Sequence, residues 1–169
     1  MGVPRKLKNL MLFNGGNAYV GEVSTVTLPK LTRKMEEWRG GGMNGPVEID
    51  LGTELLTMEW TCGGPVREVL GQYGMTRVDG VQLRFAGAYQ RDDTGGVDAI
   101  EIAVRGRHKE IDMGDAKVGD DTEFKIASTL SYYKLTWNGA IVVEIDLLNM
   151  VEMVNGTDNL TVIRNALGI

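Results

Sequence analysis

LPKLTRKMEEWRGGGMNGPVEIDL, residues 28–51, is the stretch of sequence that indicates the fold most clearly. It has no long apolar stripe at helical spacing. A proline lies near its start and another after its glycines, so we predict a strand, an exposed loop and a second strand. Four glycines fall within residues 40–45, and a loop of this composition buries little surface and loses much entropy when it orders alone. We therefore expect it to order against a partner, and we expect that partner to be protein.

The length and composition of the chain indicate one globular domain. The 169 residues are 43% hydrophobic and 24% charged, which is ordinary for a soluble protein. No run approaches the roughly 18 consecutive apolar residues that a membrane helix needs, and the basic start of the chain lacks the apolar region of a secretory signal. We expect a single domain over residues 1–169 with an extended loop at about 38–50, no membrane span, and synthesis in the cytoplasm.

The net charge and the scarcity of cysteine and histidine restrict the function further. The net charge is −5 at pH 7 and the pI is near 5.0, so the surface as a whole has no electrostatic basis for tight binding of phosphates. Cys62 is the only cysteine in the sequence, which excludes an internal disulfide and a cysteine-rich zinc site. His108 is the only histidine, and it lies in a charged segment. We predict a surface or interface position for it.

Alternation of apolar and polar residues at period two predicts half-buried strands through most of the chain. The segment LTMEWTC puts its apolar side chains on one face, and Thr57, Glu59 and Thr61 then point to the opposite face. Residues 81–90 and 98–111 are two longer strands, joined by the acidic, glycine-containing turn RDDTGG. This pair predicts a long antiparallel hairpin.

The second half of the chain continues the same pattern. A strand begins at Phe124, and its pattern slips by one residue at Tyr133, as a β-bulge would cause. An Asn-Gly turn leads into another strand, so that residues 81–145 form an antiparallel meander. Helical spacing and glycine caps favour short helices near residues 65–73 and 158–167. The predicted fold class is mainly β: an antiparallel β-sandwich or barrel with one or two short helices.

Motifs for catalysis or cofactor binding are weak. The loop matches the spacing of a dinucleotide fingerprint, Gly40-x-Gly42-x-x-Gly45, but a proline and an alternating strand follow where that fingerprint needs a helix. The carboxylates of residues 112–123 lack the spacing of a calcium loop, which favours a solvated turn. We predict no catalytic residues, no cofactor-binding residues and no metal site, and hence a protein that is not an enzyme.

Two outward strand faces carry unusually small, uncharged side chains. One face has Ala86 and Ala88, and the other has Ala127, Thr129 and Ser131. Solvated strands usually carry long polar side chains at such positions. Chance composition is one explanation, and a surface that closely approaches another subunit or lines a smooth passage is the other; both stay open.

Five segments together carry a resemblance to a known family. They are PRKLKNLMLF, VTLPKLTRKMEEWRGGGMNGPVEIDLG, RFAGAYQRDDTGG, VRGRHKEIDMGDAKVGDDTEFK and VEIDLLNMVEMVNG, and they span most of the chain in order. The chain resembles the major tail tube proteins of contractile-tailed phages of the P2 type. The motifs RGGGM and RGRHKEID are the specific ones, since neither is a generic strand sequence. Residues 53–78 do not align residue by residue.

This resemblance implies a tail-tube fold and an assembly beyond one subunit. Six protomers join into a hexameric ring whose inner strands close one continuous barrel around a channel, and stacked rings form a tube inside a contractile sheath. The implied function is that of a structural virion protein whose channel delivers the genome into the host. The implied partners are copies of the chain, the sheath, the baseplate or tube initiator, the tail terminator and the tape measure protein, while DNA passes through the lumen without stable binding. The implied location is the virion tail, made and assembled in the cytoplasm of the bacterial host.

Two sets of contact residues are expected from the resemblance together with the strand pattern. The subunit-interface set lies in the glycine-rich loop and consists of Trp38, Arg39, Gly40, Gly41, Gly42 and Met43. The lumen-facing set consists of Thr57, Glu59 and Thr61, with Glu36 on a neighbouring strand. At −5 per copy, six copies carry about −30 in each ring, and an acidic lumen repels phosphates so that DNA slides without sticking.

Other functions fit parts of the same pattern. The tube of a headless contractile bacteriocin has the same fold and passes ions rather than a genome, so neighbouring genes for capsid and packaging distinguish the two. A small soluble β-barrel hydrolase that uses two acidic residues is a different class of protein, and so is a ligand-binding barrel with an apolar cavity. A hydrolase has no need to form rings or fibres, so a measurement of size separates it from a tube protein.

Overall fold

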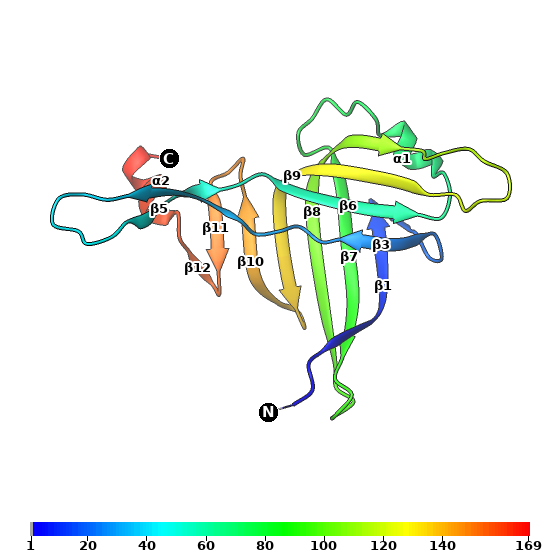
Figure 1. Ribbon diagram of the computed structural model, residues 1–169, viewed down its shortest axis with the longest axis horizontal. Coiled ribbons are helices and arrows are strands. Elements are labelled where there is room, and N and C mark those ends of the chain that lie inside the picture. The colour runs from blue at the N-terminus through cyan, green and yellow to red at the C-terminus, as the bar shows by residue number, and fades with distance from the viewer. Residues whose placement is uncertain (1) are drawn as a thin grey trace.

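The computed structural model describes residues 2–169, which form mostly antiparallel strands and two short helices (Figure 1). In chain order the elements are β1 (Lys6–Asn14), β2 (Asn17–Ala18), β3 (Val23–Thr27), β4 (Arg33–Trp38), β5 (Val47–Thr53), β6 (Leu56–Cys62), α1 (Arg67–Gly71), β7 (Val81–Gln90), β8 (Val97–Asp112), β9 (Phe124–Trp137), β10 (Ala140–Asp146), β11 (Val151–Val154), β12 (Thr157–Asp158) and α2 (Thr161–Leu167). The prediction of a mainly β fold with short helices is confirmed. In the part of the chain described, neither helix is long and apolar enough to span a membrane.

Two sheets share the strands β8 and β9. The large sheet has the strand order β12-β11-β10-β9-β8-β7-β1-β2, and its centre is the predicted meander of β7 to β10. The small sheet consists of β3, β6, residues 124–130 of β9 and residues 106–112 of β8, because β6 pairs with the first half of β9 and β3 pairs with β6. In Figure 1, β3 and β6 run across the direction of β7, β8 and β1. The two sheets therefore cross, and the core lies between them.

A bulge bends β9 where it passes from one sheet to the other. Arg105 pairs with Tyr132 and Gly106 pairs with Leu130, so Ser131 is the extra residue. A bulge bends a strand and increases its twist, which lets the two halves of β9 belong to different sheets. The predicted bulge is confirmed, but it lies before Tyr132 rather than after it.

Two close contacts accompany this bend. A side-chain carbon at Gly106 would lie 2.0 Å from the carbonyl oxygen of Thr129, so the close approach of β8 and β9 beside the bulge requires glycine. Tyr132, which the sequence pattern placed on the core face, turns outward instead. The guanidinium carbon of Arg105 lies 3.9 Å from the centre of the Tyr132 ring, a cation–π contact that compensates for part of the lost burial.

The core shows the alternation that the sequence predicts. On β6, Leu56, Met58, Trp60 and Cys62 are all buried, and the residues between them are not. The other fully buried large side chains come from β1, β7, β8, β9 and α1 and include Leu12, Phe85, Val104, Phe124 and Ile126. Truncating such a side chain to alanine typically costs about 2–5 kcal/mol, so these residues carry much of the stability of the fold.

The two predicted helices are present and shorter than expected. α1 lies within the predicted residues 65–73 and buries Val69 in the core. α2 ends at Gly168, whose φ of 76° is the left-handed conformation common at helix C-termini. Among the described residues of α2, none is buried. Helix α1 is therefore part of the body of the protein, whereas α2 lies on its surface.

The single histidine is buried within the subunit, and the predicted surface or interface position is wrong. His108 Nε2 donates a hydrogen bond to Oε1 of Gln72 at 2.8 Å, and its Nδ1 accepts one from the hydroxyl of Ser128 at 2.9 Å. Gln72 and Asn14 then exchange two amide hydrogen bonds of 2.9 Å. The charged neighbours of His108 in the sequence are exposed on the other face of β8. The number of charged residues around a position does not show which face of the strand that position occupies. This polar chain ties the end of α1 to β1 and β8.

Burial lowers the pKa of His108 to about 4 from an ordinary value of 6.5. The unfolded chain therefore binds a proton first as the pH falls. The contribution of neutral His108 to folding is fully present above pH 6.5 and is lost between pH 6.5 and pH 4. We expect the parent protein to lose up to about 3 kcal/mol more unfolding free energy than His108→Gln across this window, measured by urea unfolding at each pH. Parallel pH profiles for the two proteins would contradict this assignment.

Candidate assembly surfaces

The predicted strand, loop and second strand form an arm that projects from the body (Figure 1). β4 and β5 pair with each other in a separate two-stranded sheet, with Trp38 opposite Val47 and Glu36 opposite Ile49. The connecting loop is residues 39–46, shorter than the expected loop at about 38–50, because pairing already begins at Trp38 and Val47. None of the described residues of β4 and β5 is buried. The arm therefore has no core of its own.

The two faces of the arm differ in chemistry. Alternation along β5 and the cross-strand register place Trp38 on the same face as Val47, Ile49 and Leu51. All four side chains are exposed, Trp38 by 58%. Glu36, opposite Ile49, is a charged residue on this same face, and the other face carries Glu37 across from Glu48 and Asp50 across from Met35. An exposed apolar row on a projecting element is typical of a surface that contacts another protein.

The predicted interface residues lie at the tip of this arm and form a compact turn. The backbone N–H of Met43 donates to the carbonyl oxygen of Gly40 at 3.2 Å, and Nε of Arg39 donates to the carbonyl oxygen of Met43 at 3.2 Å. Gly42 has a φ of +81°, a conformation that other residues rarely adopt. The glycines thus allow the turn, and Trp38 stands at its base as the largest exposed side chain.

Three of the predicted lumen-facing residues share the outer face of the small sheet, and the fourth does not. Thr57, Glu59 and Thr61 alternate with the buried side chains of β6 and point away from the core. Glu59 lies opposite Thr27 on β3 and Ala127 on β9. The expectation that Glu36 lies on a neighbouring strand is wrong, because β4 pairs with β5 and β6 pairs with β3 and β9. Glu36 belongs to the arm.

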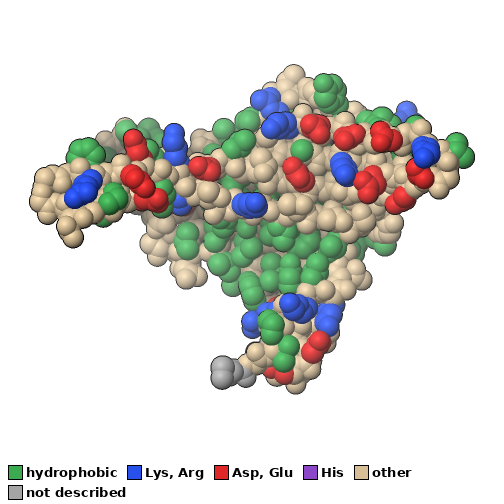
Figure 2. All heavy atoms as spheres, viewed as in Figure 1, with side chains coloured by type: hydrophobic (Ala, Val, Ile, Leu, Met, Phe, Trp, Pro, Cys, Tyr) green, Lys and Arg blue, Asp and Glu red, His purple; other side chains and the backbone are tan. Residues whose placement is uncertain are grey.

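The outer face of the small sheet is polar and mixed in charge. Beyond β6 it continues across β9 to β8, where Thr129 lies opposite Arg107, Ala127 opposite Glu110 and Lys125 opposite Asp112. Figure 2 shows acidic and basic side chains side by side over these strands. The small residues Ala127 and Thr129 lie on this face, whereas Ser131 is the buried bulge residue.

The small sheet has two open edges in the chain as described, residues 2–169. β3 pairs with β6 on one side, and its other side has no strand against it. At the opposite edge, β7 begins at Val81, which pairs with Gly106, so residues 107–112 of β8 pair with β9 alone. Both edges present backbone N–H and C=O groups that can accept a further strand.

An open apolar surface lies next to the β3 edge. The small sheet completely covers one row of side chains that runs across β1, β7 and β8 of the large sheet. The side chains of this row, Leu12, Phe85 and Ile102, are at most 3% exposed. In the next row, which contains Leu10 and Ile100, the side chains are only half-buried. We define the open apolar surface as Leu10, Ile100, Leu135, Trp137 and Val143. Figure 2 shows a continuous hydrophobic surface over β7, β8 and β9, beside β3.

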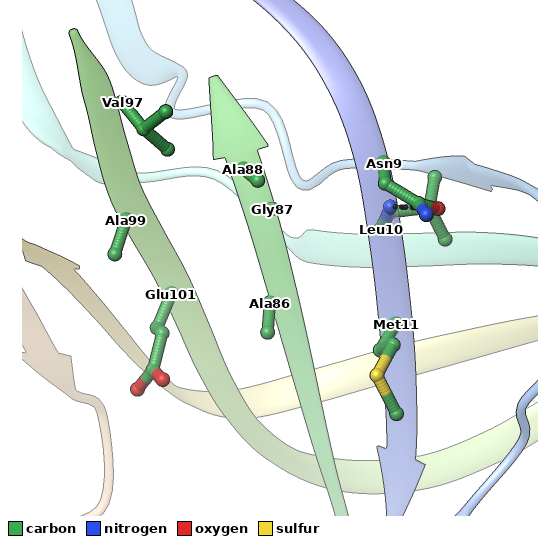
Figure 3. Close-up of a pocket in the computed structure, with 9 residues that line it drawn as sticks. All are labelled: Asn9, Leu10, Met11, Ala86, Gly87, Ala88, Val97, Ala99 and Glu101. Carbon is green, nitrogen blue, oxygen red and sulfur yellow. Dashed lines mark hydrogen bonds between the residues drawn. The ribbon is translucent and has the colours of Figure 1, made fainter. Parts of the chain in front are cut away.

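The reverse side of the large sheet carries the other predicted row of small residues. Ala86, Ala88 and Ala99 lie side by side on β7 and β8 and, with Met11 and Val97, line a shallow groove (Figure 3). The groove is open and almost wholly apolar, and it has little depth for a ligand because its floor is backbone and methyl groups. A flat apolar strip of this kind suits close approach of another protein surface better than capture of a small molecule.

The acidic turn that follows β8 is solvated, as the sequence predicts. Residues 113–123 are all exposed. Within residues 2–169, no group of three or more His, Cys, Asp or Glu side chains is arranged to hold a metal ion. The described surfaces that stand out are therefore the arm, the two sheet edges and the apolar faces of the large sheet.

The chain matches the family described as phage tail tube protein FII over residues 4–168. It is 51% identical over 172 aligned residues to the tail tube protein of Escherichia phage P2, and the alignment covers both chains completely. It is 40% identical over 154 residues to the major tail tube protein of Serratia phage KSP20, which covers 89% of this chain and 88% of that one. The chain belongs to the phage tail tube protein family.

Solved structures share the fold at low sequence identity. The sheath/tube terminator of the extracellular contractile injection system PVC superposes with a TM-score of 0.60 at 9% identity, covering 79% of this chain and 96% of that one. The sheath–tube complex of the same system gives 0.58 at 11% identity, with 79% and 91% covered. The tube-terminating cap of the anti-feeding prophage gives 0.60 at 10% identity, with 80% and 93% covered. The expected tail-tube fold is confirmed.

We expect Trp38→Ala to fold normally and to assemble poorly. The side chain is exposed, so its removal changes the melting temperature little, but the arm loses the largest apolar surface that it offers to another subunit. Tyr73→Ala is the matched control, because Tyr73 is an aromatic residue on the body that is 73% exposed. Tube formation is measured by sedimentation and negative-stain microscopy. Equal assembly of the two variants would remove Trp38 from the contact surface.

Proposed function

We propose that this chain is the structural subunit of the inner tube of a contractile phage tail, and that it polymerises as stacked hexameric rings around a channel for the genome. The observation that carries this proposal is the pair of open edges of the small sheet together with the open apolar surface beside one of them. A subunit with these features is incomplete in isolation, and a second copy completes it. Its role is structural rather than catalytic.

The two open edges are complementary to each other. The strands of the small sheet alternate in direction from β3 through β6 and β9 to β8. Because their number is even, residues 107–112 of β8 from one copy meet β3 of the next copy in antiparallel orientation. Addition of a strand to an exposed edge is a common mode of protein association. The added sheet then extends over the open apolar surface and removes it from water.

This contact joins two different edges, so it propagates from copy to copy until a ring closes. Six copies of a four-stranded sheet close a barrel of about 24 strands, wide enough to leave a channel inside. The apolar face of each small sheet is covered by the large sheet, which leaves the polar face for the channel. Thr57, Glu59 and Thr61 line the lumen in this arrangement.

The chemistry of this face suits passage of DNA rather than its capture. Its basic residues, such as Arg107 and Lys125, lie near carboxylates and form no continuous basic track. Six copies carry about −30 in each ring, which opposes retention of phosphates. DNA therefore passes without stable binding.

The arm and the large sheet are left for other contacts. The apolar face of the arm joins neighbouring subunits of the tube, and the loop of residues 39–46 orders fully against them. The further partners are the sheath, the baseplate or tube initiator, the tail terminator and the tape measure protein. Similarity in fold to structures of a sheath–tube complex and of a tube-terminating cap supports the sheath and the tail terminator among these partners. Assembly takes place in the cytoplasm of the bacterial host.

We expect Ile100→Glu to remain folded but to block ring formation. Ile100 is half-buried on the open apolar surface, so a carboxylate there keeps access to water in the single subunit and loses it under a second copy. Val118→Glu is the control, because it places the same charge on the solvated turn of residues 113–123, where Val118 is fully exposed. Thermal unfolding checks the fold, and light scattering over a range of concentrations measures the rings. Rings in Ile100→Glu would exclude the open apolar surface from the ring contact.

We expect Glu59→Lys to assemble and to impair genome release. Each ring then changes by about +12 charges in a confined and weakly screened channel, so phosphates bind to the new lysines. The substitution is on an exposed side chain and changes folding by less than about 0.5 kcal/mol. Glu59→Gln is the control for loss of the carboxylate, and DNA release and infection are compared for assembled particles. Normal release in Glu59→Lys would remove Glu59 from the lumen, and loss of assembly in both variants would place it at a subunit contact.

A further inference from the structure

The arm has no buried core that would fix its direction relative to the body. A two-stranded ribbon without a core is marginally stable in water, and the described residues of β4 and β5 are exposed along almost their whole length. The exceptions are half-buried residues at the root, Arg33 on β4 with Gly52 and Thr53 on β5. The contact between arm and body is therefore concentrated at this root.

Arg33 connects both strands of the arm to the body. Its Nε donates to Oδ2 of Asp50 at 2.8 Å, and its Nη1 donates to the hydroxyl of Thr53 at 3.1 Å. The same Nη1 also donates to Oε1 of Glu152 on β11. Arg33 thereby lowers the pKa of the Asp50 carboxyl, because its guanidinium stabilises the charged form. A planar guanidinium can hold several acceptors at fixed angles at once, which an ammonium group does not.

Glu152 is the partner on the body, and it is unusually buried for a carboxylate at 9% exposure. Its Oε1 accepts from Arg33 and from the hydroxyl of Thr53 at 3.3 Å, and its Oε2 accepts from the side-chain amide of Asn159 at 3.5 Å. The backbone of Glu152 is held as well, since its carbonyl oxygen accepts from the N–H of Asn159 at 2.8 Å. The carboxylate is thus a fixed point on β11 to which both strands of the arm attach.

We propose that Glu152 is a positioning residue for assembly: it fixes the angle at which the arm leaves the body, so that the apolar face of the arm is already presented to the next subunit. The proposal rests on the proposed function of the arm as a subunit contact. A pre-ordered arm loses less conformational entropy when it binds than a swinging one. The residues that connect the arm to β3 and β6 are too few to form a hydrophobic core of their own. The ion-pair cluster at the root therefore fixes the angle of the arm.

The direction of the arm is measurable in the single subunit. Spin labels are attached at Gly41→Cys on the tip of the arm, where a side chain meets no other atom, and at Lys134→Cys on the central strand β9. Cys62 remains unlabelled, because it is buried and burial raises the pKa of its thiol to about 11. Double electron–electron resonance (DEER) spectroscopy then gives the distribution of distances between the two spin labels, on the arm and on the body, for the parent protein and for each Glu152 variant.

We expect a narrow distribution in the parent protein and a broad one in Glu152→Ala. Glu152→Gln restores most of the narrow distribution, because its amide oxygen still accepts from Arg33 and Thr53 at the same reach, and only the 3.5 Å contact with the Asn159 amide is lost. Assembly of Glu152→Ala falls by about tenfold in apparent association constant, equivalent to about 1.4 kcal/mol, at temperatures well below its melting temperature. Asp98→Asn is the matched control, since Asp98 also pairs with an arginine, Arg5, but away from the arm.

Two results would overturn the proposal. One is a distribution in Glu152→Ala as narrow as that of the parent protein, and the other is a broadened distribution with undiminished assembly. A parent protein that forms no rings even when tail components are supplied counts against the proposed function instead. In that case the distance distributions, recorded on the single subunit, still decide whether Glu152 sets the direction of the arm.

Discussion

The bend that β8 and β9 share is the constraint on which the rest of this structure depends. Just before the bulge residue Ser131, the backbone of Thr129 and Leu130 lies so close to Gly106 that position 106 has no room for a side chain. The two strands continue through the bend without a break, so each contributes one half to the large sheet and the other half to the small sheet. Covalent continuity therefore sets the crossing of the sheets, and the side chains of β6 fill the space between them. A larger residue at position 106 would push β8 and β9 apart and separate the two layers.

The same bend explains why one subunit is incomplete. The small sheet is narrower than the apolar face of the large sheet, so it covers Phe85 and Ile102 fully and leaves Ile100 half-buried. A single chain that exposed an apolar surface beside an open strand edge would risk aggregation. Under the proposed function, the same two features serve as a contact for another copy. In the proposed ring, assembly supplies the burial that the single subunit lacks, and the stability of each subunit is coupled to the integrity of the tube.

The arm and the body are stabilised by different kinds of interaction. The body is held by a buried core, whereas the arm is held by backbone pairing between β4 and β5 and by charged groups at its root. An element of this kind is easily reoriented, because few apolar contacts must be broken to move it. Placing a nearly buried carboxylate, Glu152, at the root gives a direction to an arm whose apolar face is left free for a partner. The polar contacts and the apolar contacts of the arm thus have separate roles.

The sequence by itself determined the local elements and the family. Period-two alternation identified β6, β7 and β8, the glycine-rich loop identified the arm, and specific motifs such as RGGGM identified a tail tube protein, because all of these are patterns between residues close together in the chain. Only the tertiary structure decided how these elements meet. In the tertiary structure His108 is buried, and the bulge lies at Ser131 rather than at Tyr133. Glu36 does not share the face of Glu59, and Arg33 forms an ion pair with Glu152. Each of these depends on strand register or on contacts between residues far apart in sequence, and a one-residue change in register reverses the face of every side chain.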